Sequence, residues 1–100
     1  FDELTGLRNR RSFMEITHTE FLRARRYARG LGAALVDIDH FKAINDHHGH
    51  QAGDEVLRQV ARACSAALRG SDHIGRIGGE EFAVLLEQGF EAALAVTRRN

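Results

Sequence analysis

The chain contains no proline or tryptophan, and only one cysteine and one methionine. A single cysteine excludes an internal disulfide and is typical of a reducing compartment. No apolar run approaches the roughly 18 residues of a membrane span, and no signal peptide opens the chain. We therefore expect a cytoplasmic domain with no membrane segment of its own, although segments outside this sequence could tether the parent protein. Without proline or low-complexity tracts, linkers and disorder are not expected.

An excess of one charge is also missing, because 14 Lys and Arg residues balance 14 Asp and Glu residues. No overall field therefore attracts a nucleic acid polymer or a membrane. The hydrophobic fraction of 43% is enough for one small domain with a modest core. Basic residues gather locally in the first third of the chain, where we expect a solvated helix face. They are Arg8, Arg10, Arg11, Arg23, Arg25, Arg26 and Arg29.

A helix is predicted from about Arg10 to Arg29, because apolar residues recur there at the helical period. Turn and capping residues precede it, and glycines at positions 30 and 32 are expected to end it. The stripe expected to face the core comprises Phe13, Ile16, Thr17, Phe21, Ala24, Tyr27 and Ala28.

The next apolar run, residues 33–36, leads into Asp37-Ile38-Asp39. A short run without alternation predicts a strand buried on both faces, and hence a central one. Carboxylates at the carboxyl end of such a strand lie where α/β sheets place ligand sites. A functional role is favoured for Asp37, since a buried acid is costly unless it is paired or binds a cation. Asp39 is instead favoured as the N-cap of a helix over residues 40–45.

Residues 45–54 are predicted to form a polar loop with three histidines. A structural zinc site needs four suitably spaced ligands, and the single Cys64 lies inside a helical pattern, so a hydrogen-bonding loop is favoured over zinc. That pattern predicts a helix from about Asp54 to Arg69, with Asp54 at its start and Cys64 in its core face. Another helix is predicted from Phe90.

Between these helices, the runs 73–77 and 82–86 flank Gly78-Gly79, a pattern typical of a β-hairpin whose tight turn needs positive φ. Glu80 and Glu81 open its second strand. If the hairpin pairs with the strand ending at Asp37, acids from distant positions meet at one sheet edge. Convergent oxygen ligands suit Mg²⁺, and adjacent glycines let a phosphate chain approach the backbone. A neighbouring amide and carboxylate, Asn45 and Asp54, would recognise a purine edge, with guanine favoured.

Three segments in this order and spacing resemble the GGDEF family of diguanylate cyclases. They are the opening Asp2–Arg11, the segment Asp37–Asp54, and Gly78–Phe82 in the GGEEF form that active members also use. The resemblance implies an α/β (α+β) fold similar to nucleotidyl cyclases, with a central β-sheet flanked by helices and a signature β-hairpin. It also implies that residues 1–100 are the N-terminal, larger part of a single GGDEF domain, without its C-terminal part.

The resemblance further implies roles for individual residues. Asp37, the carbonyl of Ile38, and Glu80 would hold Mg²⁺, or Mn²⁺, on the GTP phosphates, and Glu81 would assist at the metal or orient the turn. Glu80 would also be the base for the attacking 3′-hydroxyl, while Lys42 would offset charge on the phosphoryl group. The implied substrate-binding residues are Asn45, His50, Asp54, Gly78 and Gly79, and the implied RxxD product-inhibition site is Arg69 and Asp72.

The reaction implied by the family joins two GTP molecules into cyclic di-GMP and releases pyrophosphate. Each protomer binds one GTP, so catalysis requires a homodimer. The alternative is a catalytically silent module that binds cyclic di-GMP or GTP as a sensor, which the intact signature disfavours. If the absent part of the domain includes strands, the 100-residue chain has an exposed sheet edge and turns over GTP slowly.

Overall fold

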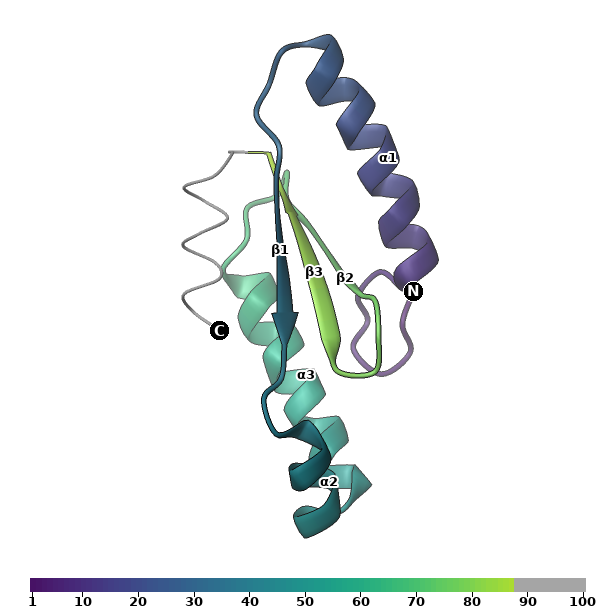
Figure 1. The fold of residues 1–100 in the computed structure, drawn as a ribbon, viewed down its shortest axis with the longest axis vertical. Helices are drawn as coiled ribbons and strands as arrows, with labels where there is room; N and C mark the ends of the chain where they lie inside the picture. The colour runs from purple at the N-terminus through teal and green to yellow at the C-terminus, as the bar shows by residue number, and fades with distance from the viewer. Residues whose placement is uncertain (88–100) are drawn as a thin grey trace.

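The structure is a computed structural model that describes residues 1–87. The helix predicted from Phe90 lies outside the described residues. Three strands form an antiparallel sheet in the order β1-β3-β2, with helices on both faces (Figure 1). No helix within residues 1–87 has the length and apolar character needed to cross a bilayer. The elements are α1 (Arg10–Arg26), β1 (Gly32–Asp37), α2 (Phe41–His48), α3 (His50–Ala66), β2 (His73–Arg76) and β3 (Glu81–Leu86).

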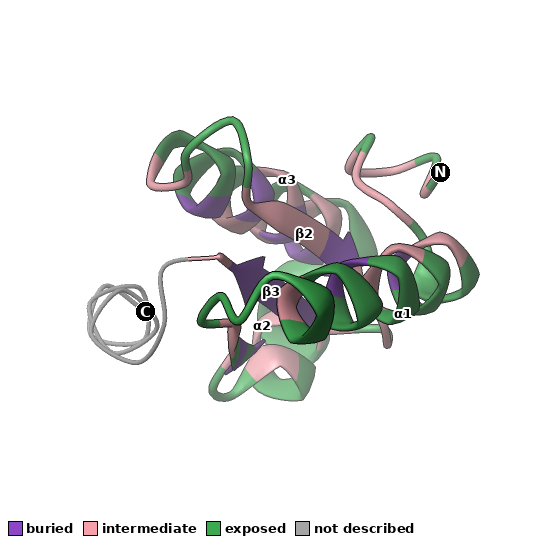
Figure 2. Cartoon of the chain, turned by 90° about the horizontal axis from the view of Figure 1, so that it is seen from above, coloured by how far each residue is buried: buried purple, intermediate pink, exposed green. Residues whose placement is uncertain are grey.

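The core lies on both faces of β3, where residues 82–86 are all buried (Figure 2). Phe82 packs with Leu57 and Cys64 of α3, which confirms the core role predicted for this cysteine. On the opposite face, Ala83 and Leu85 pack against Phe13 of α1. A continuous apolar run thus marks the strand that is covered on both sides. The expected mixed fold, a sheet flanked by helices, is confirmed.

The prediction that β1 is a central strand is wrong for the part of the chain that the structure describes. β1 is an edge strand, and its burial alternates: Ala34 and Val36 are buried, whereas Leu35 is 73% exposed. The reason is the position of α1, which packs over β2 and leaves the same face of β1 without a helix from residues 1–87 (Figure 1). Sequence alternation is weak here because alanines occupy both faces.

The predicted core stripe of α1 is correct only at its start. Phe13 is buried, but Phe21 and Tyr27 are 53% and 59% exposed. The C-terminal end of α1 extends past the end of the sheet (Figure 1). The helix also ends before the glycines. Ala28 adopts a left-handed conformation with φ of 54°, and the amide of Arg29 donates to the carbonyl of Ala24 at 2.9 Å. An alanine thus occupies the place that glycine commonly takes.

The polar segment 45–54 is mostly helical rather than a loop. α2 and α3 meet at Gly49, whose φ of 87° permits the sharp change of direction between them. Asp54 therefore lies in the second turn of α3 and not at its start. The N-cap position of α2 is His40, with φ of 58° and no side-chain capping bond, so Asp39 is not the predicted cap.

Candidate nucleotide and metal site

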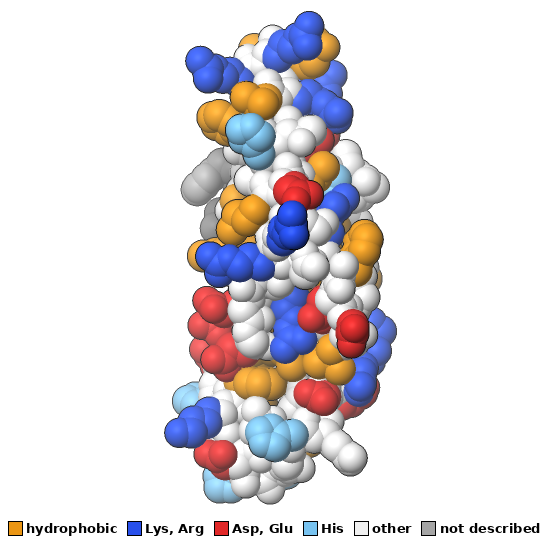
Figure 3. All heavy atoms as spheres, turned by 90° about the vertical axis from the view of Figure 1, so that its right-hand side faces the viewer, with side chains coloured by type: hydrophobic (Ala, Val, Ile, Leu, Met, Phe, Trp, Pro, Cys, Tyr) orange, Lys and Arg blue, Asp and Glu red, His pale blue; other side chains and the backbone are white. Residues whose placement is uncertain are grey.

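The pairing of β1 with β3 places the acids predicted to meet at neighbouring backbone positions of one sheet edge, although within residues 1–87 their carboxylates do not form a group of three with metal-ligand spacing. Asp37, the last residue of β1, is the direct antiparallel partner of Glu81, the first residue of β3. One position further on, the amide of Ile38 donates to the carbonyl of Glu80 at 3.3 Å. Directly paired residues share a face, and both Asp37 and Glu81 are exposed there. Figure 3 shows acidic side chains gathered at the left, below the middle of the molecule, at the height where β1 ends in Figure 1.

The turn between β2 and β3 differs from the predicted two-residue turn. The hairpin itself is confirmed, but its strand pairing stops at Arg76 and Phe82, and the positive-φ glycines of residues 1–87 are elsewhere in the chain. A Cβ at Gly78 would lie 2.5 Å from Oε1 of Glu81, which is the end of an exposed side chain. A Cβ at Gly79 would meet nothing within 4 Å. The turn therefore has an open backbone surface beside the acids.

An ion pair that the sequence reasoning missed holds this turn. Arg76 donates from Nη2 and Nε to the carbonyl of Gly79 at 2.7 and 3.2 Å, and from Nη1 to Asp2 at 3.2 Å. Asp2 also accepts from the amide and hydroxyl of Thr5 at 2.9 and 2.7 Å. Burial opposes ionisation, but the Thr5 hydrogen bonds and the Arg76 charge outweigh it and lower the pKa of Asp2. The opening segment therefore supports the turn that precedes Glu80.

The predicted purine-recognising pair, Asn45 and Asp54, is placed on adjoining helices. A Cβ at Gly53 would collide with Oδ1 of Asn45 and lie 2.9 Å from its Cγ, so the Asn45 side chain lies directly on α3 beside Asp54. Both residues are partly exposed. Glycine at position 53 thus permits the close approach of the Asn45 amide to the helix backbone.

The remaining predicted site residues lie on the surface. Lys42 is exposed in the first turn of α2, and His50 is exposed at the start of α3. Arg69 is exposed, whereas Asp72 has a local structural role: its carboxylate accepts from the amides of Arg69 at 3.0 Å and Glu87 at 3.4 Å. These two bonds give Asp72 a structural reason to occupy the turn. The exposed Arg69 guanidinium makes no hydrogen bond or ion pair with the described residues.

Among residues 1–87, the three histidines of the α2–α3 segment do not form a group with metal-ligand geometry. The single group of three that meets this geometry within the same range consists of Glu20, His73 and Glu87, at the other end of the sheet.

The profile of the family described as "Diguanylate cyclase, GGDEF domain" matches residues 1–99. The chain belongs to the GGDEF family. It is 46% identical over 96 residues to the probable diguanylate cyclase DgcC of Escherichia coli K12, covering 96% of this chain and 26% of DgcC. It is 51% identical over 85 residues to the diguanylate cyclase DgcP of Pseudomonas aeruginosa, covering 85% of this chain and 13% of DgcP. This GGDEF chain therefore spans about a quarter or less of these relatives.

Solved GGDEF structures have the same fold. The GGDEF domain of DgcB from Caulobacter crescentus, determined in complex with c-di-GMP, superposes with a TM-score of 0.93 at 33% identity, covering 98% of this chain and 58% of that one. The diguanylate cyclase SiaD of Pseudomonas aeruginosa, determined with its activator SiaC, superposes with a TM-score of 0.90 at 44% identity, covering 98% of this chain and 38% of that one.

Proposed function

We propose that this GGDEF chain is part of a diguanylate cyclase, which condenses two GTP molecules into cyclic di-GMP and releases two pyrophosphates. The observation that carries the proposal is the pairing of Asp37 with Glu81, and of Ile38 with Glu80, beside an open turn at Gly79. Oxygen donors and an accessible backbone are what a metal–triphosphate complex requires. The family membership and the names of the relatives support the same activity.

The residues at this edge fit Mg²⁺ better than Zn²⁺, because all the donors are oxygens. Asp37, the carbonyl of Ile38 and Glu80 would hold the ion, with Glu81 assisting or fixing the turn; Mn²⁺ would bind the same donors. When bound, Mg²⁺ supplies charge stabilisation at the phosphate oxygens and lowers the pKa of a nearby hydroxyl. The solvent-exposed position of Asp37 leaves room for phosphate and water ligands.

The protein residues then have separate tasks. Asn45 and Asp54 bind the guanine edge, the Asn45 amide and the Asp54 carboxylate forming hydrogen bonds with the donors and acceptors of the base. His50 lies on the same helix as Asp54, at the start of α3. Glu80 accepts the proton of the 3′-hydroxyl as its oxygen attacks the α-phosphorus of the second GTP, and pyrophosphate leaves. Lys42 offsets the negative charge that develops on the transferred group.

The proposal also requires a homodimer, since one chain offers one nucleotide site and the reaction joins two nucleotides in line. Arg69 and Asp72 form the product-inhibition site in this proposal. The exposed guanidinium of Arg69 is suited to bidentate contact with a phosphate or a guanine edge. The Asp72 carboxylate accepts hydrogen bonds from the amides of Arg69 and Glu87, and it therefore holds the Arg69 backbone in place.

The test is incubation of the full-length protein with GTP and Mg²⁺, followed by chromatography of the products. Three variants accompany the parent: Glu80→Gln, Arg69→Ala, and the matched control Glu55→Gln, whose carboxylate is 48% exposed on α3. We expect cyclic di-GMP from the parent and the control, and none from Glu80→Gln. Arg69→Ala should remain active at product concentrations that inhibit the parent.

Absence of product from the parent, with tight cyclic di-GMP binding that Arg69→Ala abolishes, would contradict the cyclase and support a sensor. Equal product from the parent and Glu80→Gln would contradict the role of Glu80.

A further inference from the structure

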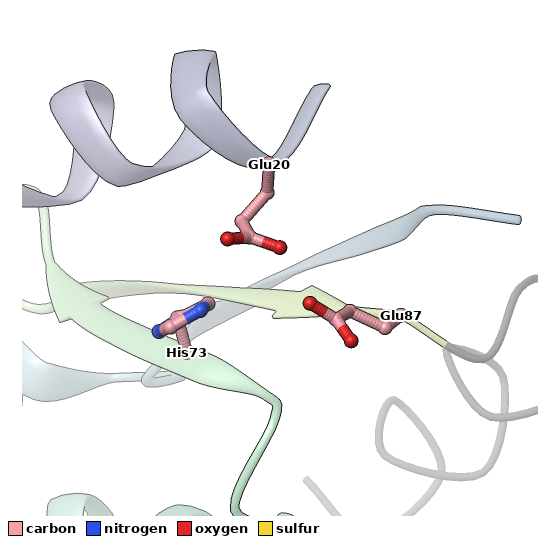
Figure 4. Close-up of side chains that lie close together, drawn as sticks. All are labelled: Glu20, His73 and Glu87. Atoms are coloured by element: carbon pink, nitrogen blue, oxygen red, sulfur yellow. The ribbon is translucent and has the colours of Figure 1, made fainter. Parts of the chain in front are cut away.

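Glu20, His73 and Glu87 come together from three different elements at the end of the sheet opposite Asp37 and Glu80. Glu20 projects from α1, His73 begins β2, and Glu87 directly follows β3 (Figure 4). One ligand atom of each lies within 4.8 Å of the other two. None of these residues belongs to the proposed nucleotide site, so their convergence needs a separate explanation.

The burial of Glu20 makes this cluster unlike an ordinary group of surface acids. Its exposed fraction is 4%, although it lies in the second half of α1, where neighbouring apolar residues are exposed. A buried carboxylate is costly unless a positive charge or a proton compensates it. Arg23 gives partial compensation, with Nη1 3.2 Å from Oε1 of Glu20, but its own side chain is 53% exposed.

Glu87 increases the cost, because it adds a second carboxylate beside the first. A hydrogen bond with Glu20, together with burial and the Glu20 charge, raises the pKa of Glu87. The His73 imidazole adjoins this pair and has no hydrogen bond or ion pair to any other residue in the range 1–87. A divalent cation would compensate both carboxylate charges and could take the imidazole as its third ligand.

We propose that Glu20, His73 and Glu87 form a second divalent-cation site that binds a transition-metal ion of the Zn²⁺ class. The donor set decides the class of ion: two carboxylate oxygens and one imidazole nitrogen suit Zn²⁺, whereas Mg²⁺ prefers oxygen alone. Donors around a Zn²⁺ ion are about 3.4 Å apart when each bond is about 2.1 Å. Glu87 and His73 are only partly buried, so their side chains have room to rotate toward a bound ion.

Neighbouring residues hold two of the three proposed ligands, Glu20 and Glu87, in place. Arg23 holds the inner ligand Glu20 from the solvent side, and such partners orient a ligand carboxylate. The amide of Glu87 donates to Asp72, the residue before His73, at 3.4 Å. An ion at this position would therefore fix α1, β2 and the end of β3 together. Three protein ligands leave the fourth position for water.

The experiment is calorimetric titration of the metal-free full-length protein with Zn²⁺, in excess Mg²⁺ to occupy sites built only of oxygens. The test variants are His73→Ala and Glu20→Gln. Glu20→Gln relieves the repulsion between carboxylates and should keep the fold, which circular dichroism checks. The matched control is His48→Ala, an exposed histidine of α2 outside the cluster. Cobalt absorption spectra give a second readout, since imidazole coordination alters the d–d bands of Co²⁺.

We expect one Zn²⁺ per chain in the parent and in His48→Ala, with affinity lowered about 100-fold or more in His73→Ala and Glu20→Gln. The Co²⁺ bands should change only in these two variants. Unchanged Zn²⁺ affinity in folded His73→Ala would overturn the proposal, as would loss of binding in His48→Ala instead. A folded parent that binds no Zn²⁺ would overturn it as well.

Discussion

Replacing Arg76 with methionine removes the guanidinium that links the opening segment to the signature turn while keeping a side chain of similar length. The substitution removes two hydrogen bonds to the Gly79 carbonyl and the ion pair with Asp2. The side chains of Arg76 and Asp2 are 19% and 20% exposed. Hydrogen bonds to charged groups contribute about 1.5–3 kcal/mol, but water partly replaces them at this exposure, so we expect a loss of about 2 kcal/mol in unfolding free energy. Glu80 follows Gly79 directly, so GTP turnover should fall by about tenfold or more.

Urea unfolding followed by circular dichroism measures the stability change, and product chromatography measures turnover. The matched control is Arg62→Met on α3, where the guanidinium is 65% exposed and pairs only with exposed Glu55 among the described residues. Such surface pairs contribute about 0–1 kcal/mol. A double-mutant cycle with Asp2→Asn should give a coupling of about 1 kcal/mol. Equal unfolding free energies for the Arg76 and Arg62 variants, or zero coupling, would refute the reasoning.

Three further predictions concern packing and pH. Gly75→Ala places a Cβ 2.7 Å from the Cβ of Phe13 and should lower the free energy of unfolding by about 1–3 kcal/mol, measured by thermal unfolding. The control Gly70→Ala places its Cβ in open space and should leave the stability unchanged. Gly53→Ala should displace the Asn45 side chain and weaken GTP binding by about tenfold, measured by calorimetry; unchanged affinity would contradict its proposed role. Because the folded state lowers the pKa of Asp2, its carboxylate stabilises the fold above the unfolded pKa of about 4, and this contribution is lost as pH falls through the lower folded pKa. The melting temperature of Asp2→Asn should therefore decrease less than that of the parent as pH falls below about 4.

The sequence predicted the elements that depend on local chemistry. The apolar run of β3 and the hairpin interrupted by glycines are both predicted correctly. A strand buried on both faces needs consecutive apolar residues, and a chain reversal favours glycine. The meeting of Asp37 with the hairpin acids also followed once the two strands were expected to pair.

Features that depend on where α1 lies could not be predicted in the same way. The period of α1 is helical throughout, but only tertiary packing decides that Phe13 is buried and Phe21 is exposed. The contact between Asp2 and Arg76 joins residues 74 positions apart, and neither residue type indicates a partner at that distance. The burial of Glu20 could not be predicted, because a glutamate in an arginine-rich helix resembles a solvated residue.

The most direct test of the proposed activity compares Asp37→Asn with Asp39→Asn in the full-length protein. Both aspartates are exposed and lie two positions apart, but only Asp37 pairs with the hairpin acids. Cyclic di-GMP formation is measured from GTP over a range of Mg²⁺ concentrations. Loss of a metal ligand removes several kcal/mol of charge stabilisation, so Asp37→Asn should be slower by about 100-fold or more, while Asp39→Asn stays near the parent rate. Parent-like turnover and Mg²⁺ dependence in Asp37→Asn would contradict the account.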